Sequence, residues 1–310
     1  MDIIIIIEQM CVMLFLILLG YFLFRKNQFN DMTSRQISGL VVNFCNPAVL
    51  VCSAFEDGPK ASLSQLLTAL IVTLCLYGIL IAAGFVIPRI MGLPKEEQYI
   101  YHFLTVYGNV GFLGIPLVSA VMGSSALIYV SINCLVYNIL FYTSGLGIIR
   151  QKAAVKKQSG IRDLFSKIVN AGTISAVLTI LFYLGNFNVP SVVKDSFTYT
   201  GRATTLLSML VLGVSIAQMP LKEIFCHKKD YLFIALRMLL VPVLCVLLLK
   251  QVISDPLLLG SSALLIAVPC ANLPLMSARE YGLKADVLAR TIVLSTLLSI
   301  ITIPVVALFL

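Results

Sequence analysis

Two apolar stretches of this chain are interrupted in their middles by proline, and they occupy matching places in its two halves. The first stretch, 109–117, contains Pro116, and the second, 268–275, contains Pro269 and Pro274. Inside a bilayer a broken helix leaves backbone groups without water, so a break survives only where it is buried or lines a site. Paired breaks at corresponding positions of two halves are typical of the binding site of a secondary transporter.

The composition places the chain in a membrane. Hydrophobic residues make up 59% of the sequence and charged residues only 12%, and the mean hydropathy is +1.00. A soluble domain carries about 25% charged residues, and about 20 apolar residues span a bilayer as a helix. The pattern predicts an all-α membrane protein with ten spans, at 2–24, 36–55, 65–90, 98–121, 125–149, 167–187, 200–219, 230–252, 258–279 and 287–309.

The basic residues predict the orientation of these spans. If the N-terminus lies outside, 17 of the 22 Lys and Arg fall in inside loops and four fall outside, namely Lys60, Lys194, Arg202 and Lys250, while Arg237 lies within a span. Lysine and arginine concentrate on the cytoplasmic side of membrane proteins. We therefore expect a multi-pass protein of the plasma or inner membrane with both termini outside. The net charge of +8 then reflects topology rather than nucleic-acid binding.

The basic segment 150–166 divides the chain into two halves of five spans each. An odd number of spans per half gives residues 1–149 and 167–310 opposite orientations in the membrane. Corresponding spans are offset by about 160 residues, which places the two proline breaks opposite each other. The sequence thus predicts an inverted repeat of five plus five helices joined by a cytoplasmic linker.

The breaks predict half-helices that end near the bilayer centre. Proline has no N–H and crowds the carbonyl four residues before it, so Pro116 should free the carbonyl of Phe112. Pro269 and Pro274 should together leave 269–273 extended. By contrast, Pro47, Pro88, Pro242 and Pro304 are expected to be simple kinks or helix ends.

Half-helix ends can hold ions of either sign. Free N–H groups at an N-terminus carry about half a positive charge and can bind an anion, whereas free carbonyls at a C-terminus suit a cation. The amides of Asn109 and Asn272 lie beside the two breaks and can donate to a carboxylate. Asn133 and Tyr137 either line the same cavity or join helices by hydrogen bonds. Arg237 is either functional or anchored at the inner end of its span.

Several segments together resemble the auxin efflux carrier family, which includes plant auxin carriers and bacterial carboxylate permeases. Asn109 followed by Gly114-Ile115-Pro116-Leu117 resembles the fourth-helix motif of that family. The other similar segments are 43–48 with Asn46 and Pro47, 212–220, 237–242, and 269–282 with Pro269 and Pro274. Five segments in the right order and spacing cover essentially the whole chain.

The resemblance implies a fold and an activity. Members have ten helices in two inverted repeats with helices 4 and 9 crossing, a plan shared with bile-acid symporters. Helices 1, 2, 6 and 7 form a dimerising scaffold, and helices 3–5 and 8–10 form a transport domain that moves like an elevator. The resemblance implies an organic-anion substrate, auxin-like or a short carboxylate such as malate or malonate. Asn109 matches the asparagine that contacts the carboxylate.

The candidate substrate-binding residues follow from the breaks and the resemblance together. They are Asn46, Asn109, Gly114, Ile115, Pro116, Asn133, Tyr137, Pro269, Asn272 and Pro274. The buried acid that plant members carry in the third helix is absent here, since 64–69 reads Ser-Gln-Leu-Leu-Thr-Ala. No acid is expected near the site, so we predict flux driven by the anion gradient and membrane potential, or by coupled Na⁺.

Other classes of protein fit the sequence less well. An enzyme would need a nucleophile–base pair, an acid dyad or a metal set, and the two histidines and eight cysteines form no such pattern. We expect no cofactor and no metal. A channel would give fluxes that do not saturate. A sodium-coupled symporter of organic acids, of the bile-acid type, remains the nearest alternative.

Overall fold

The chain is described here as a computed structural model that covers residues 3–55, 60–153, 161–185, 187, 189–283 and 285–310. The regular structure of these residues is helical, apart from one isolated antiparallel bridge between Gly108 and Cys270. The all-α class predicted from composition is therefore confirmed. Within the described residues, seven helical runs are long and apolar enough to cross a membrane, and three shorter apolar helices accompany them.

The helices of the first half follow one another with short connections. They are α1 (Ile3–Arg25), α2 (Asp31–Leu40), α3 (Asn46–Ser53), α4 (Leu63–Ile90), α5 (Lys95–Val106), α6 (Ile115–Met122), α7 (Leu127–Leu140) and α8 (Leu146–Lys152). Three π-turns and one 3₁₀ turn join consecutive helices: η1 (Val41–Cys45), η2 (Val110–Gly114), η4 (Phe141–Gly145) and η3 (Ser124–Ala126).

The second half also contains both long and broken helices. Its helices are α9 (Ile161–Ile168), α10 (Ala171–Gly185), α11 (Ser191–Ala217), α12 (Leu221–Phe225), α13 (Lys228–Ala235), α14 (Val241–Val252), α15 (Pro256–Ala267), α16 (Asn272–Glu280) and α17 (Asp286–Ala307). The π-turn η5 (Leu236–Leu240) joins α13 to α14. The expected seventh span, 200–219, begins nine residues earlier, at Ser191. Its first turns are polar, which concealed them from the hydropathy pattern.

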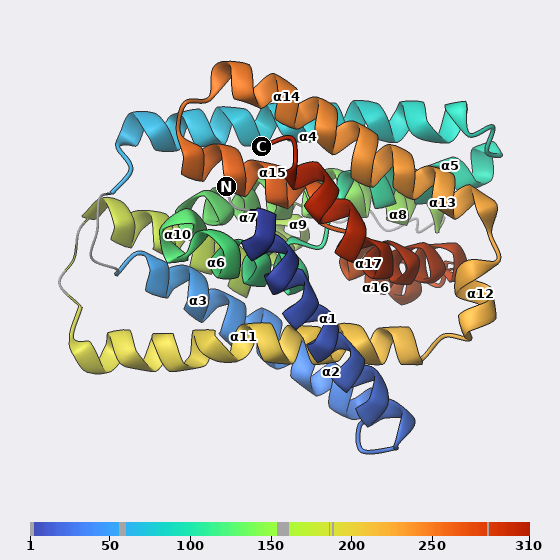
Figure 1. Cartoon of the computed structure of the whole chain (residues 1–310), viewed down its shortest axis with the longest axis horizontal. Coiled ribbons are helices and arrows are strands. Elements are labelled where there is room, and N and C mark those ends of the chain that lie inside the picture. The colour runs from blue at the N-terminus through green and yellow to red at the C-terminus, as the bar shows by residue number, and fades with distance from the viewer. Residues whose placement is uncertain (1–2, 56–59, 154–160, 186, 188, 284) are drawn as a thin grey trace.

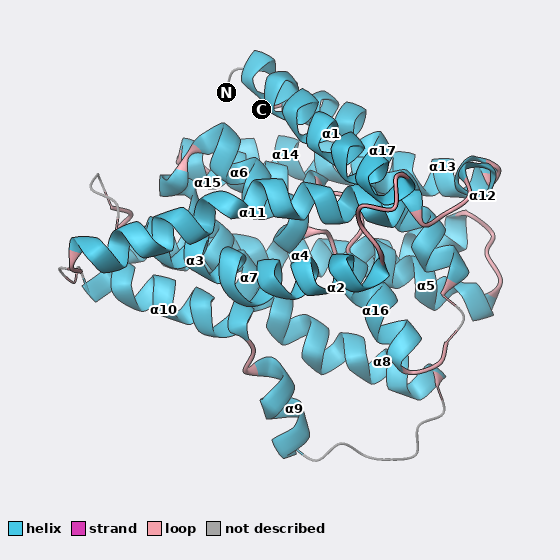
Figure 2. Cartoon of the chain, turned by 90° about the horizontal axis from the view of Figure 1, so that it is seen from below, coloured by secondary structure: helices cyan, strands magenta, loops and turns pink. Residues whose placement is uncertain are grey.

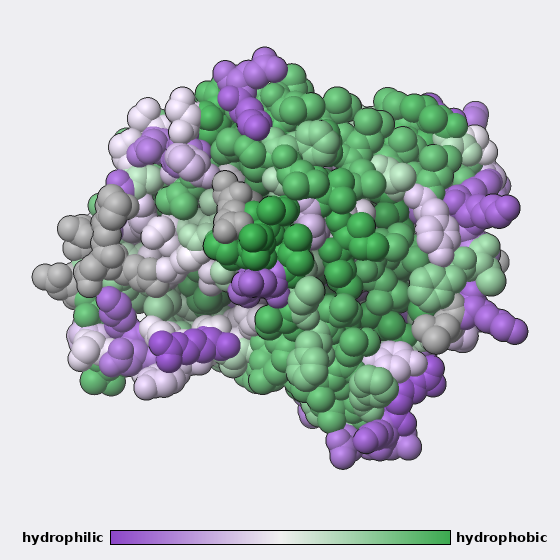
Figure 3. All heavy atoms as spheres, viewed as in Figure 1, coloured by the Kyte–Doolittle hydropathy of each residue, from purple (hydrophilic) through white to green (hydrophobic). Residues whose placement is uncertain are grey.

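The surface is arranged as a membrane requires. A broad apolar band covers the middle of the face in Figure 3, and polar residues gather toward the two ends of the long axis. Large apolar side chains point outward along α1 and α4, for example Phe15, 70% exposed, and Ile71, 60% exposed. Most of the predicted linker 150–166 lies outside the described residues, but α8 continues to Lys152 and α9 begins at Ile161.

The long helices α4 and α11 lie in different parts of the molecule. In Figure 1, α4 and α11 run along opposite edges of the molecule, and α1 crosses α11. Figure 2 shows the two chain ends close together, where α1 begins and α17 ends. The crossing of α1 and α11 depends on glycine, because a Cβ on Gly213 would lie 2.0 Å from the Ile17 carbonyl oxygen. Gly20 faces the backbone of Leu210 in the same way.

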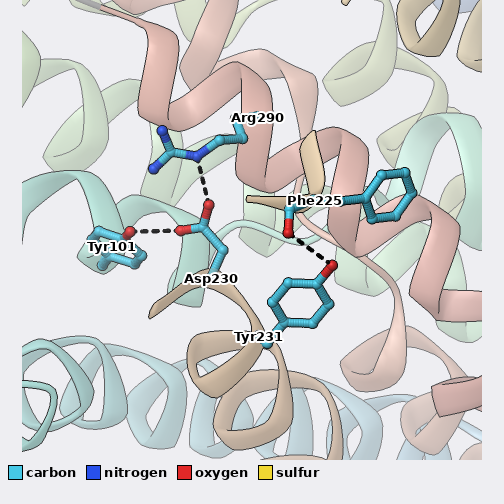
Figure 4. A network of polar contacts seen from close by, with 5 residues as sticks. All are labelled: Tyr101, Phe225, Asp230, Tyr231 and Arg290. Atoms are coloured by element: carbon cyan, nitrogen blue, oxygen red, sulfur yellow. Dashed lines mark hydrogen bonds and ion pairs between the residues drawn. The ribbon is translucent and has the colours of Figure 1, made fainter. Parts of the chain in front are cut away.

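A buried ion pair ties three helices together at one end of the molecule. Asp230 at the start of α13 is fully buried, accepts from Arg290 Nε of α17 at 2.6 Å and from the Tyr101 hydroxyl of α5 at 2.7 Å (Figure 4). At the opposite end, Asp255 caps α15 through Leu257 N–H at 2.9 Å and also accepts from the Tyr129 hydroxyl. These carboxylates join α13 to α5 and α17, and α15 to α7.

Candidate functional site

The two broken helices cross each other at their breaks. Asn109 N–H donates to the Pro269 carbonyl at 2.7 Å, and Ala271 N–H donates to the Tyr107 carbonyl at 3.0 Å. These two bonds make the antiparallel bridge between Gly108 and Cys270. The extended segments satisfy each other's backbone groups, which is the condition for breaking a helix away from water. Four half-helix ends therefore meet in one place: the C-termini of α5 and α15 and the N-termini of η2–α6 and α16.

The first break lies upstream of the proline that was expected to cause it. The chain leaves the helix at Tyr107–Asn109, and Pro116 lies in the first turn of α6. The π-turn η2 widens the helix before it, since Ile115 N–H donates to the Val110 carbonyl five residues back. The prediction that Pro116 itself marks the break is wrong. After a π-turn the helix can continue through a proline. The missing N–H of the proline then leaves one carbonyl without an intrahelical donor.

The carbonyl that Pro116 leaves without an intrahelical donor is that of Gly111, and it has a partner from another helix. In the π register Pro116 would have donated to Gly111, and the Gly111 carbonyl instead accepts from Asn46 Nδ2 of α3 at 3.0 Å. Gly111 leaves room for this approach, because a Cβ there would lie 3.3 Å from Asn46 Nδ2. Asn46 is buried, and its Oδ1 atom has no partner in the described structure. Asn46 thus joins α3 to the half-helix that begins at the crossover.

Proline after a π-turn recurs in the fold. Pro47 follows η1 and Pro242 follows η5 at the same spacing as Pro116 follows η2. These two prolines were expected to be simple kinks or helix ends. The structure shows that each lies two residues after a π-turn, as Pro116 does. Pro88 and Pro304 lie inside the continuous helices α4 and α17.

The second break is shorter than expected. Residues 268–271 are not helical, but α16 already begins at Asn272, so the expected extended run 269–273 ends two residues early. Pro274 fits in the first turn of α16 because an N–H there has no intrahelical partner in any case. Pro269 lies in the extended segment, and its carbonyl accepts from Asn109.

Asn109 caps one half-helix and leaves its amide free. Its Oδ1 accepts from Phe112 N–H at 3.2 Å, so the side chain caps the N-terminus of η2. Asn109 is only 3% exposed, and its Nδ2 atom has no hydrogen-bond partner in the described structure. An unpaired buried amide costs about 1–3 kcal/mol. A donor that is left without a partner at a helix N-terminus is suited to an anionic ligand.

Arg237 reaches the crossover from η5. It is 1% exposed and donates from Nε to the Thr105 carbonyl at 2.6 Å and from Nη1 to the Ile266 carbonyl at 2.8 Å. Thr105 and Ile266 lie in the last turns of α5 and α15. The possibility that Arg237 is anchored at the membrane interface is therefore wrong. The hydropathy pattern could not distinguish a side chain inside the helix bundle from one at the membrane interface, because it does not show which neighbour the side chain faces.

A small cavity lies beside Arg237. Its volume is about 20 Å³, enough for one water molecule. Its lining includes Gly108, Asn133, Arg237, Ser262 and the ring of Tyr77. Asn133 accepts from the Tyr77 hydroxyl at 3.3 Å, so it joins α7 to α4 by a hydrogen bond, the second of its two expected roles.

A larger cavity opens between α3, α6 and α11. Its volume is about 490 Å³, and Ile115 and Pro116 form part of its wall. Arg202 lies in its lining together with several hydroxyl groups, those of Ser53, Ser119, Ser124, Thr198, Thr204 and Thr205. Neither Asn109 nor Asn272 lines it. Pro116 is seven residues beyond Asn109, or about 10 Å along a helix, so this cavity reaches η2–α6 at the far side of that segment from the crossover.

The other predicted residues lie around this centre. Gly114 lies at the end of η2, where a Cβ would come 3.0 Å from Leu265 of α15. Asn272 is half-buried as the first residue of α16, which has no side-chain cap. Tyr137 lies in a group of rings with Tyr77, Phe141 and Tyr107, the residue that ends α5. Sequence reasoning missed Asp230, whose only signal was a position at the edge of the eighth span.

The helices, their apolar surface and the crossed breaks define a multi-pass membrane protein. Residues 5–307 match the model of the membrane transport protein family, so the chain belongs to that family, and the resemblance to auxin efflux carriers is confirmed.

Three relatives show how the similarity is distributed. A protein of Rhizobium meliloti named "Putative malonate transporter" is 25% identical over 302 residues, covering 93% of this chain and 90% of the relative. The uncharacterized transporter YfdV of Escherichia coli K12 is 21% identical over 206 residues, 65% of this chain and 66% of the relative. The uncharacterized transporter MJ1031 of Methanocaldococcus jannaschii is 23% identical over 224 residues, 69% and 70% of the two chains.

Proposed function

We propose that this membrane transporter is a secondary carrier of small organic anions that binds a carboxylate at the crossover. The observation that carries the proposal is the pair of half-helix N-termini with the unpartnered amide of Asn109 beside one of them. The second N-terminus, at Asn272, has no side-chain cap. Two such ends together offer about one positive charge and several N–H donors.

The substrate class follows from this chemistry and from one relative. Short carboxylates such as malonate or malate match a small site that offers N–H donors, and auxin-like anions share the same carboxylate group. The name of the Rhizobium meliloti relative favours malonate as the first compound to test. The cavity that Arg202 and the hydroxyl groups line would receive such an anion before it reaches the crossover.

We propose further that the carrier has ten spans in two inverted repeats and moves as an elevator. Helices α1–α3 and α9–α11 would form the scaffold and dimer interface, and α4–α8 and α13–α17 the moving domain. The internal carboxylate contacts of Asp230 and Asp255 support this division, because each joins helices of the moving domain only. Both termini would lie outside, as the distribution of basic residues indicates. Labelling of a cysteine at Lys60 from inside only would contradict that orientation.

The proposal is tested with the purified protein in proteoliposomes. Uptake of radiolabelled malonate should saturate and should accelerate when malonate is loaded on the opposite side, which distinguishes a carrier from a channel. In thermal-shift measurements malonate, malate, acetate or indole-3-acetate should raise Tm, since a ligand stabilises the state that it binds. Malonamide is the neutral control. An equal shift with malonamide, or no saturable uptake of any of these acids, would contradict an anion site.

A further inference from the structure

Arg237 is a buried charge whose partners are all neutral. Its guanidinium is bound by the carbonyls of Thr105 and Ile266, and no carboxylate contacts it within the described part of the chain. Placing an arginine at the centre of a membrane helix costs at least about 2.5–3.5 kcal/mol. The two carbonyls that bind Arg237 lie at helix C-termini, so the backbone must offset the cost of burying its charge.

The charges of the four half-helix ends can be counted. Each C-terminus carries about half a negative charge and each N-terminus about half a positive charge. The four ends of the crossover therefore sum to about zero and favour no ion of either sign. Arg237 places one positive charge at the C-termini of α5 and α15. This charge cancels their combined negative charge of about one. The N-termini at Asn109 and Asn272 are then left with about one uncompensated positive charge.

We propose that Arg237 is the residue that gives the crossover its selectivity for anions. It acts as a positioning residue, because it holds the C-termini of α5 and α15 together and removes their negative potential while the N–H groups on the other side bind the carboxylate. This inference rests on the proposed carboxylate site. The guanidinium lies close to the backbone of Gly108, because a Cβ on that glycine would lie 3.4 Å from Arg237 Nη2.

The same arrangement bears on the coupling ion. The carbonyls that a sodium ion would use at the C-termini of α5 and α15 already accept from Arg237. A cation entering there would meet the full charge of the guanidinium without a carboxylate to offset it. The fixed arginine thus takes the place of a coupling cation at this position, and sodium should not be required for carboxylate binding.

Three variants of the full-length protein separate charge from hydrogen bonding. Arg237→Gln keeps an amide donor and removes the charge, Arg237→Ala removes both, and Arg89→Ala removes an exposed arginine that bonds only within α4. A unit charge acting over about 8 Å at an effective dielectric of about 20 changes anion affinity by roughly 30-fold. We expect both Arg237 variants to lose about that factor in malonate affinity, and Arg89→Ala to lose nothing.

Free guanidinium ion should rescue Arg237→Ala. A purely structural role of the arginine side chain would not predict that malonate affinity recovers. At low millimolar concentration guanidinium should raise Tm of Arg237→Ala and restore part of its malonate affinity, with no such effect on wild type or Arg89→Ala. Wild-type affinity in Arg237→Gln, or absence of rescue in Arg237→Ala, would overturn the inference. If wild type binds none of the carboxylates, the proposed function fails, while the Tm response of Arg237→Ala to guanidinium still decides whether the two carbonyls form a cation-binding site.

Discussion

Asn109 combines two roles that can be separated by substitution. Its Oδ1 caps η2 and its Nδ2 is the free donor at the proposed anion site. Asn109→Asp keeps the capping oxygen and nearly the same shape but sets a negative charge against the anion. We expect Asn109→Asp to retain its thermal stability and to lose malonate binding more completely than Asn109→Ala.

Asn109→Ala should lose both roles. Its malonate affinity should fall by about 1–3 kcal/mol, the cost of removing one partner of a buried hydrogen bond. Its stability should also fall by about 1 kcal/mol from the lost cap. Isothermal titration measures the first quantity and thermal unfolding the second. Normal malonate affinity in a folded Asn109→Asp protein would place the anion elsewhere.

At the scale of elements, the contact between α3 and η2 depends on Pro116. Asn46 donates to the Gly111 carbonyl, which lacks an intrahelical partner because Pro116 has no N–H. Asn46→Ala should therefore lower stability by about 1–3 kcal/mol. In a Pro116→Ala background the helix can supply that N–H itself, so the same change should cost less. A double-mutant cycle measured by unfolding detects the difference, and strictly additive effects would contradict this coupling.

The crossing of α1 and α11 predicts which glycines are essential. A Cβ on Gly213 would meet the Ile17 carbonyl oxygen at 2.0 Å, whereas a Cβ on Gly78 of α4 would meet nothing within 4 Å. Gly213→Ala should force the two helices apart and cost about 1–3 kcal/mol. Gly78→Ala should be neutral or stabilising, by up to about 1 kcal/mol of helix propensity. Equal Tm values for the two variants would show that the crossing is more compliant than its contacts indicate.

Single elements show which features a sequence can predict. The breaks near Asn109 and Pro269 were found because prolines and asparagines lie at matching places in the two apolar halves. The exact position of the first break was not found, because η2 lets Pro116 remain helical through a register that composition does not reveal. Asp230 was missed and the role of Arg237 was left open, since the contacts of both residues are with helices distant in sequence.

At the scale of the whole molecule, Asp230 bears on how transport is driven. It is a buried acid on the same span as Arg237, and a proton-coupled carrier usually carries an acid or histidine within its bundle. Asp230 is, however, paired with Arg290 at 2.6 Å and accepts from Tyr101. A pair of this kind holds helices together, and removing one partner of a pair with a buried member is strongly destabilising. It is better suited to a structural role than to a proton relay.

The whole carrier should therefore respond to membrane potential and to the substrate gradient. In proteoliposomes with a fixed potential, malonate accumulation should be the same with sodium or potassium outside, because Arg237 already binds the carbonyls that a sodium ion would use. A pH gradient alone should drive no accumulation beyond the protonation of malonate itself, because Asp230 is held by Arg290. An inside-positive potential should accelerate uptake of the anion. Accumulation driven by a sodium or proton gradient at zero potential would contradict this mechanism, and a comparison with Asp230→Asn would show whether that acid carries the proton.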